Sequence, residues 1–376
     1  MTGEADLRRD RVPAVRGDLA DVVPYGAPQL DVPVRLNTNE TALPPPEAFL
    51  AELARRIGSL ELNRYPDRDA VELRQALAAR EGLAPERVWA ANGSNEVLLQ
   101  LMQAYGGPGR SALLFRPGYS MYPELCRTTA TQAHTVALSD DGRLTSSQLG
   151  DAVARIVAEH DPVITLLANP NNPTGALVDH DMLRALHDAV NGLLVVDEAY
   201  IEFAAPGATA RPLLEELPRL VVSRTFSKAF RLAGLRLGYL LAPSQVVEDL
   251  LTVRLPYHLD AITQLGGIVA LEQEAAFLDH RQETADERDR VAHRLAQLDG
   301  IDVLPSAANF LLLHARPADL FDRLLERGVL VRDLSSAVGR PGTLRVTVGT
   351  PAENDAFLAA LSAVLDGRDG RDGRQE

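Results

Sequence analysis

Lys228 is the only lysine in this chain of 376 residues, and 37 of its 38 lysine and arginine residues are arginines. Arginine keeps its proton at physiological pH, so it supplies charge and hydrogen bonds but no nucleophile. A lysine amine can lose its proton and then react with an aldehyde. Because a lone lysine is also typical of a solvated surface position, the residues around Lys228 must decide between these interpretations.

Three apolar segments, each typical of a buried strand, lead to polar side chains. ITLLANPNNPTG leads to Asn172, LLVVDEAY to Asp197 and LVVSRTFSK to Lys228. The carboxyl ends of parallel strands meet at one edge of a sheet, which is where ligands bind in open α/β folds. An amine for an aldehyde, a carboxylate for a pyridine nitrogen and donors for a ring oxygen together suit pyridoxal phosphate. The sequence therefore predicts a site for this cofactor.

A phosphate site is indicated where AANGSNEVLLQLM passes from a strand into an amphipathic helix. At this helix start, Ser94, Asn95 and Glu96 would offer backbone amides that lack partners within the helix. Ser94 could instead serve only as an N-cap.

Short apolar runs alternate with amphipathic helical segments from Val88 onward, which favours an α/β fold with a mostly parallel sheet flanked by helices. The last third of the chain is typical of a smaller α+β domain. It contains a charged helical segment at about 271–299, followed by the strand-like NFLLLH, VLVRD and LRVTVG. We expect an N-terminal arm at residues 1–30 and a large domain at residues 31–257. A small domain should follow at residues 258–367, and a disordered tail at residues 368–376.

The net charge of −14 argues against a nucleic-acid or anionic membrane partner. Cys126 is the only cysteine, which suits a reducing compartment, and no apolar stretch approaches the length of a membrane span. The first residues, MTGEADLRRDRVP, lack the apolar segment of a signal peptide. We therefore expect a cytoplasmic protein. The histidines lack metal-ligand spacing, so no metal is expected, and His258 is interpreted as structural.

The order of the motifs resembles that of fold-type I aminotransferases. NPNNPTG is followed by VDEAY and then by SKAF with LAGLRLGY. Within that group the chain is similar to the histidinol-phosphate aminotransferases, especially the actinobacterial ones, over nearly its whole length. The resemblance implies a large domain that binds pyridoxal phosphate and a smaller C-terminal α+β domain.

The resemblance also implies a role for each matching residue around the cofactor. Lys228 would hold the cofactor and then move a proton between substrate and cofactor. Asp197 would pair with the pyridine nitrogen, and Tyr119 would stack on the ring. Asn172 and Tyr200 would bind the ring oxygen. The phosphate would be held by Ser94, Asn95, Glu96, Thr225, Ser227 and Arg236, together with Tyr65 of a neighbouring subunit. The last contact implies a homodimer with shared active sites.

For the substrates, Arg332 and Arg345 match two family arginines that hold anionic groups, and Asn39 lies in the segment at the substrate entrance. Tyr25 in the arm resembles a residue that closes over the substrate, although it could equally be an ordinary arm residue. The usual Asn-Glu-Asn-Pro of the family reads Asn39-Glu40-Thr41-Ala42 here. This departure leaves the preferred amino donor open.

The implied reaction is transamination between histidinol phosphate and 2-oxoglutarate, which yields imidazole acetol phosphate and glutamate. An aromatic amino-acid aminotransferase is the nearest alternative, and a threonine-phosphate decarboxylase is a more distant one with the same cofactor. A cofactor-sensing regulator would carry a DNA-binding domain ahead of this fold, and the arm of about 30 residues is too short for one.

Overall fold

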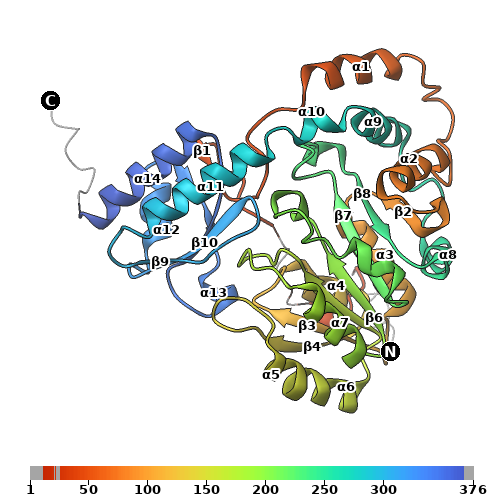
Figure 1. Ribbon diagram of the computed structural model, residues 1–376, viewed down its shortest axis with the longest axis horizontal. Helices are drawn as coiled ribbons and strands as arrows, with labels where there is room; N and C mark the ends of the chain where they lie inside the picture. The colour runs from red at the N-terminus through yellow and green to blue at the C-terminus, as the bar shows by residue number, and fades with distance from the viewer. Residues whose placement is uncertain (1–11, 21, 23–25, 368–376) are drawn as a thin grey trace, which may run out of the picture.

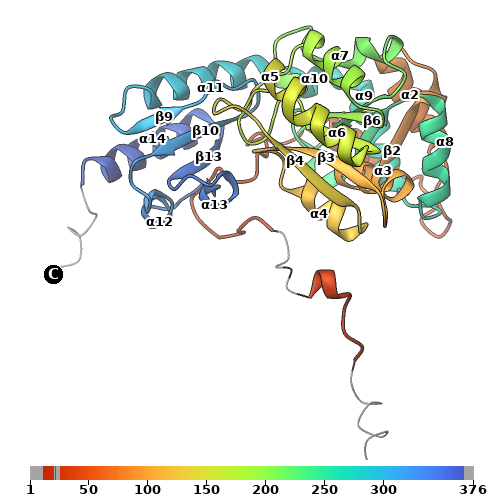
Figure 2. The same cartoon turned by 90° about the horizontal axis from the view of Figure 1, so that it is seen from below.

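The computed structural model describes residues 12–20, 22 and 26–367. Figure 1 shows two lobes, a large lobe around a long sheet and a small lobe formed mainly by the C-terminal third of the chain. The segment of residues 12–20 lies outside both lobes (Figure 2) and contacts the large lobe through Arg16, whose Nη2 donates to Arg127 O (3.1 Å). Tyr25 lies outside the described residues.

The large lobe is built on a seven-stranded sheet with the order β2-β8-β7-β6-β5-β3-β4. The paired neighbours among β3 to β7 run parallel, while β8 runs antiparallel to β7 and β2. The mostly parallel α/β sheet predicted from the sequence is thereby confirmed. The strands are β2 (Val88–Ala91), β3 (Ser111–Arg116), β4 (Gln132–Ala137), β5 (Ile164–Ala168), β6 (Leu193–Asp197), β7 (Leu220–Thr225) and β8 (Gly238–Leu241).

Both faces of this sheet are covered by helices, because successive residues of its strands point to opposite sides. Val196 and Val222 belong to the core shared with α1, α2, α6, α7 and α9, whereas Val195 and Val221 belong to the core shared with α3, α4 and α8. The helices of this lobe are α1 (Glu47–Ile57), α2 (Val71–Glu81), α3 (Ser94–Tyr105), α4 (Met121–Thr128), α5 (Ser146–Gln148), α6 (Ala154–His160), α7 (His180–Ala189), α8 (Ser244–Val253), α9 (Ala261–Glu272) and α10 (Glu274–Leu278).

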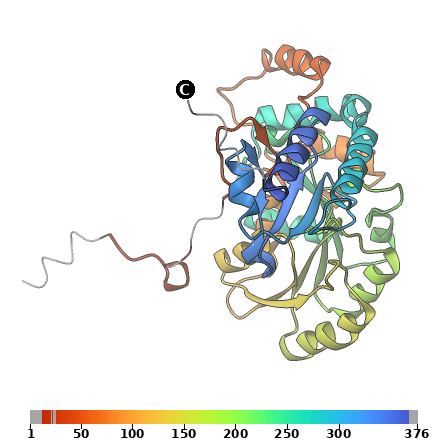
Figure 3. The same ribbon diagram turned by 90° about the vertical axis from the view of Figure 1, so that its left-hand side faces the viewer.

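The small lobe contains a four-stranded antiparallel sheet with the order β12-β13-β10-β9. Leu311 and Leu313 of this sheet pack against α11 and α14 in a separate core, and both helices lie along the lobe in Figure 3. Its elements are β9 (Ile301–Val303), β10 (Phe310–Ala315), β12 (Arg332–Asp333), β13 (Thr343–Thr347), α11 (Arg281–Leu295), α12 (Leu320–Leu325), α13 (Ser335–Val338) and α14 (Pro351–Leu365).

An early segment of the chain joins the small lobe. Strand β1 (Val34–Arg35) pairs in parallel with β11 (Val329–Leu330), and Val34 and Leu36 lie in the small-lobe core. Conversely, Ile268 of α9 and Phe277 of α10 pack in the core of the large lobe. We therefore propose that the small lobe consists of residues 34–36 together with the chain from α11 onward, rather than of residues 258–367 alone.

Two local predictions differ from the structure. The segment at about 271–299 is not one helix, because α10 ends at Leu278 and α11 begins only at Arg281. Between them His280 is buried, and its Nε2 contacts Ala229 O at 3.0 Å. VLVRD is also divided, since β11 pairs with β1 and β12 pairs with β13.

Candidate active site

A cavity of about 390 Å³ opens at the carboxyl ends of β5, β6 and β7 and is closed on its other side by residues of the small lobe. Most of the site residues predicted from the sequence line it. They are Asn39, Ser94, Asn95, Tyr119, Asn172, Asp197, Tyr200, Thr225, Ser227, Lys228, Arg236, Arg332 and Arg345. The parallel register brings the ends of the three strands together, because Ala168, Asp197 and Ser223 are neighbours across β5, β6 and β7.

Two predicted residues lie elsewhere. Glu96 does not line the cavity, and its amide donates to Gly93 O (3.1 Å), so the prediction that it offers a free amide is wrong. Its carboxylate instead accepts a hydrogen bond from Asn92 N (2.6 Å) at the start of α3. Tyr65 is 80% exposed and stacks on Tyr257, with ring centroids 4.4 Å apart. Within one chain it does not line the cavity.

Lys228 follows β7 and extends its amine into the cavity. Its Nζ donates to Thr38 O (3.0 Å) and lies 5.9 Å from the centre of the Tyr200 ring. Burial lowers the pKa of Lys228 to about 8, and the positive charge of Arg345 acts in the same direction. The neutral, nucleophilic form of the amine is consequently accessible near neutral pH.

This lowered pKa can be measured directly because the chain has one lysine. Reductive methylation with ¹³C-labelled formaldehyde should label only Nζ of Lys228 and the N-terminal amine. We expect the Nζ methyl signal in the NMR spectrum to titrate with a midpoint near pH 8 instead of the ordinary 10.5. Glu40→Gln should lower the midpoint further, since the Glu40 carboxylate raises this pKa. A midpoint close to 10.5 in the folded protein would contradict the desolvated site.

Asp197 is buried at the end of β6 and is oriented by Tyr122, whose hydroxyl donates to Oδ2 (3.1 Å). Burial raises the pKa of Asp197 to about 6. Its Oδ1 is buried and has no hydrogen-bond partner among the described residues. Because a buried carboxylate oxygen without a partner is costly, this atom fits a cationic N–H donor such as a protonated ring nitrogen.

Tyr122 was not predicted from the sequence. It lies three residues after Tyr119, on the first turn of α4, and the two rings meet edge to face with centroids 5.5 Å apart. Tyr119 is held in turn by Asn95, whose Oδ1 accepts from the tyrosine hydroxyl (3.1 Å). The spacing of the two tyrosines in GYSMY was the available signal, but it does not reveal that the second one reaches Asp197.

Tyr200 forms the centre of an amide cluster beside the amine. Its hydroxyl oxygen accepts hydrogen bonds from Nδ2 of Asn39 (3.0 Å) and Nδ2 of Asn172 (3.1 Å). Arg345 Nη1 donates to Asn172 Oδ1 (2.7 Å), and its Nη2 donates to Asn37 O (2.9 Å). These contacts join the small lobe to the strand ends of the large lobe and fix the donors that face the cavity.

The two predicted arginines come from adjacent strands. Arg332 of β12 lies opposite Arg345 of β13 in the register, and both line the cavity. Arg332 Nη1 also donates to Gly26 O in the N-terminal segment (3.2 Å). Two guanidinium groups on one wall provide a binding surface for carboxylate or phosphate anions.

A second concentration of donors lies at the N-terminus of α3. Thr225 Oγ1 and Ser227 Oγ are 3.0 Å apart, and Arg236 Nη1 lies 3.4 Å from Ser227 Oγ. Gly93, with φ of +81°, permits this approach, because a Cβ there would lie 2.6 Å from Arg236 Nη2. The helix N-terminus, hydroxyls and guanidinium together fit a phosphate group.

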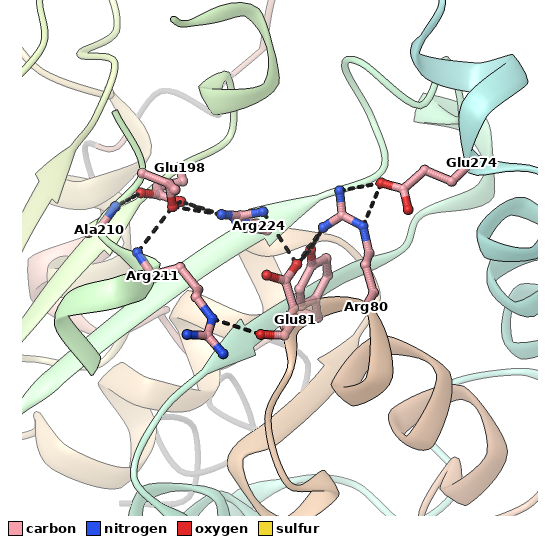
Figure 4. Close-up of polar contacts among 9 residues, drawn as sticks. Arg80, Glu81, Glu198, Ala210, Arg211, Arg224 and Glu274 are labelled. Atoms are coloured by element: carbon pink, nitrogen blue, oxygen red, sulfur yellow. Dashed lines mark hydrogen bonds and ion pairs between the residues drawn. The ribbon is translucent and has the colours of Figure 1, made fainter. Parts of the chain in front are cut away.

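A buried network of charged residues supports the strands on the opposite face from the cavity. Figure 4 shows Arg224 pointing toward Glu198 and Glu81, with Nη2 of Arg224 2.9 Å from Glu198 Oε2 and Nη1 3.3 Å from Glu81 Oε1. Tyr239 donates to the same Glu81 oxygen (2.7 Å). Because Arg224 precedes Thr225 and Glu198 follows Asp197, the network holds the ends of β6 and β7 in a fixed relation.

The remaining candidate features are His258, a metal site and a membrane span. His258 stacks on Trp89 and its Nε2 contacts Ala90 O (2.9 Å), which agrees with its interpretation as a structural histidine. Across the described ranges, no group of His, Cys, Asp and Glu side chains could hold a metal ion. None of the described helices combines the length and the apolar character needed to cross a membrane.

Comparison with known proteins defines the class. The family model "Aminotransferase class I and II" matches residues 32–361, so the chain belongs to this family and is an aminotransferase. The predicted resemblance to fold-type I aminotransferases is confirmed.

Two curated relatives of this chain are histidinol-phosphate aminotransferases. The histidinol-phosphate aminotransferase of Mycobacterium marinum (strain ATCC BAA-535 / M) is 47% identical over 362 residues, covering 93% of this chain and 92% of the relative. That of Corynebacterium glutamicum (strain R) is 45% identical over 366 residues, covering 93% and 96%. The crystal structure of histidinol-phosphate aminotransferase from Sinorhizobium meliloti in complex with pyridoxal-5'-phosphate has a TM-score of 0.82 at 25% identity. The structural match covers 96% of this chain and 100% of the Sinorhizobium meliloti chain.

Proposed function

We propose that this aminotransferase uses pyridoxal phosphate to transfer an amino group from histidinol phosphate to 2-oxoglutarate. The observation that carries the proposal is the composition of one cavity. It contains the only lysine of the chain, a buried aspartate and three arginines, Arg236, Arg332 and Arg345. Curated relatives that carry this activity in their names are 45–47% identical over 93% of the chain, which supports the assignment.

The residues present suit the cofactor at three points. Oδ1 of Asp197 would meet the pyridine nitrogen, since it is buried and has no described partner. Asn172 and Tyr200 would bind the ring oxygen, and Tyr119 would cover the ring. The phosphate would lie at Ser94, Asn95, Thr225, Ser227 and Arg236. When bound, pyridoxal phosphate supplies an electron sink that stabilises negative charge at the α-carbon of the substrate.

Lys228 would carry the proton at the α-carbon. Its amine is next to Tyr200 and has a pKa of about 8, so it can both accept and return a proton near neutral pH. Asp197 would keep a positive charge on the ring nitrogen, because a buried carboxylate is stabilised by an adjacent cation. The contacts of Asn172 to Tyr200 and Arg345 would couple the ring site to the substrate site.

Arg332 and Arg345 would hold the anionic end of each substrate. Histidinol phosphate presents a phosphate there, whereas glutamate and 2-oxoglutarate present a carboxylate. A planar guanidinium can bind either anion with two parallel hydrogen bonds. This shared chemistry lets one cavity serve both amino-group partners.

A homodimer is part of the proposal. Tyr65 is exposed in a region with other exposed apolar side chains, including Leu62 (64%) and Leu255 (74%). Burial of these side chains against a second copy would remove apolar surface from water and could bring Tyr65 to the phosphate of the neighbouring site. Sedimentation of the protein at the mass of one chain would contradict this part of the proposal.

The substrate is tested by a single half-reaction. The protein loaded with pyridoxal phosphate is mixed with histidinol phosphate in the absence of keto acid, and the change in the cofactor absorbance is followed. We expect conversion at far lower concentrations of histidinol phosphate than of phenylalanine. Histidinol, which lacks the phosphate, should react poorly because it offers no anion to Arg332 and Arg345.

The comparison of donors separates the alternatives. Preference for phenylalanine would identify an aromatic amino-acid aminotransferase and overturn the substrate assignment. Equal rates with histidinol and histidinol phosphate would contradict the role of the two arginines. Release of carbon dioxide from threonine phosphate, without transfer of its amino group, would indicate the decarboxylase.

A further inference from the structure

Thr41 lies directly against the main chain of Lys228, although 187 residues separate them. The hydroxyl of Thr41 donates to Lys228 O at 2.7 Å. At the other end of the same lysine, Nζ donates to Thr38 O at 3.0 Å. The segment of residues 38–41 therefore contacts Lys228 both at its backbone and at its amine.

This segment is anchored independently of Lys228. Asn39 N donates to Thr347 Oγ1 (2.9 Å), and Asn309 Nδ2 donates to Asn39 O (3.2 Å). Asn39 has a φ of +55°, a left-handed conformation that asparagine adopts more readily than most residues. The small lobe thus holds the segment in place, and the Thr41 hydroxyl transmits that placement to the lysine.

Lys228 has two hydrogen-bond donors at its main-chain carbonyl. It follows the end of β7 at Thr225, and its carbonyl accepts one further bond, from Arg231 N within the turn (2.9 Å). A carbonyl oxygen has two lone pairs, so the turn supplies one partner and Thr41 supplies the second. The flanking residues are held separately, since Phe226 and Phe230 are buried and Ala229 O contacts His280 Nε2. Thr41 adds a contact from outside the turn to the Lys228 carbonyl itself.

We propose that Thr41 is a positioning residue for Lys228, whose hydroxyl fixes the lysine backbone so that Nζ meets the cofactor aldehyde in a defined geometry. This inference rests on the proposed function. In the sequence, Thr41 occupies one of the two positions that depart from the Asn-Glu-Asn-Pro pattern. The structure shows that the departing residue makes a contact with the reactive lysine.

The test measures capture of pyridoxal phosphate by the cofactor-free protein, before any amino donor is added. In this step the amine nitrogen bonds to the aldehyde carbon and one water is released. Varying the cofactor concentration separates the initial, noncovalent binding constant from the rate of covalent capture. Thr41→Val removes the hydroxyl and keeps the shape of the side chain, whereas Thr41→Ser keeps the hydroxyl.

We expect Thr41→Val to slow capture about tenfold, the size expected for loss of one well-formed hydrogen bond, with the initial binding constant unchanged. Thr41→Ser should capture the cofactor within about twofold of the wild-type rate. The matched control is Thr252→Val, which removes a hydroxyl that donates to a backbone carbonyl at the same 2.7 Å, on the remote helix α8. This control should leave both quantities unchanged.

Capture by Thr41→Val at the wild-type rate would overturn the proposal. So would equal slowing in Thr41→Val and Thr41→Ser, because Thr41→Ser keeps the hydroxyl and the effect would then not depend on the hydrogen bond. If Thr41→Val does not fold, Thr41→Ala serves in its place. Failure of the wild-type protein to capture the cofactor would instead refute the proposed function, and the two failures are therefore distinguishable.

Discussion

Replacement of Lys228 by arginine should abolish transamination while leaving the fold intact. The guanidinium keeps the positive charge and can still donate to Thr38 O, the partner of Nζ in the structure. It cannot be deprotonated at physiological pH, so it neither attacks an aldehyde nor accepts a proton from the substrate. Loss of proton transfer alone corresponds to a fall in kcat on the order of 10²–10⁴-fold, and loss of covalent attachment adds to it.

The measurement is kcat of the variant with histidinol phosphate and 2-oxoglutarate, alongside noncovalent binding of pyridoxal phosphate, which should persist through the phosphate contacts. Borohydride reduction of the loaded wild-type protein should fix the cofactor on the tryptic peptide of residues 225–231, which contains Lys228. The variant should acquire no label there. Substantial turnover by Lys228→Arg, or label confined to the N-terminal amine, would contradict the assignment.

Asp197→Asn should produce the second largest loss of activity. A neutral amide can still accept the hydrogen bond from Tyr122, so the local packing is preserved. It cannot stabilise a positive charge on the ring nitrogen, and electrostatic stabilisation of this kind is worth about 10²–10³-fold in kcat. The loss should appear in kcat more than in KM, because Asp197 would contact the cofactor ring, whereas Arg332 and Arg345 would hold the substrate anion.

The same substitution should stabilise the cofactor-free protein at neutral pH. The pKa of Asp197 is raised from 3.8 to about 6 in the folded state, so between these values the folded chain binds more protons than the unfolded chain. Stability therefore falls as pH rises through this window, and the cost is complete above about pH 6. Asparagine avoids this cost, which we place at about 1–3 kcal/mol.

Thermal unfolding checks both statements. Without cofactor, Tm of Asp197→Asn should exceed that of the wild type at pH 7.5, and the difference should vanish near pH 4. With pyridoxal phosphate bound, the wild type should gain more stability than the variant, since Asp197 then has a cationic partner. A variant that is less stable than the wild type in the cofactor-free state would refute the interpretation of Asp197 as a buried carboxylate without a cationic partner.

Much of the fold could be predicted from periodicity. The apolar runs that lead to Asn172, Asp197 and Lys228 form three neighbouring parallel strands. Because these strands are parallel, the three residues lie at the same edge of the sheet. The division of the lobes was harder to predict. β1 belongs with β11 nearly 300 residues later in the chain, and no local pattern in a two-residue strand specifies such a partner.

The sequence by itself determined the chemistry that this protein can perform. One amine among 37 arginines, a carboxylate at a strand end and a glycine before a helix are local features, and their chemical properties do not depend on the rest of the chain. The tertiary structure decided which groups tune that chemistry. Tyr122 reaches Asp197 and Thr41 reaches Lys228 across 75 and 187 residues. Such contacts depend on packing and on the direction of each side chain, and spacing along the chain contains neither.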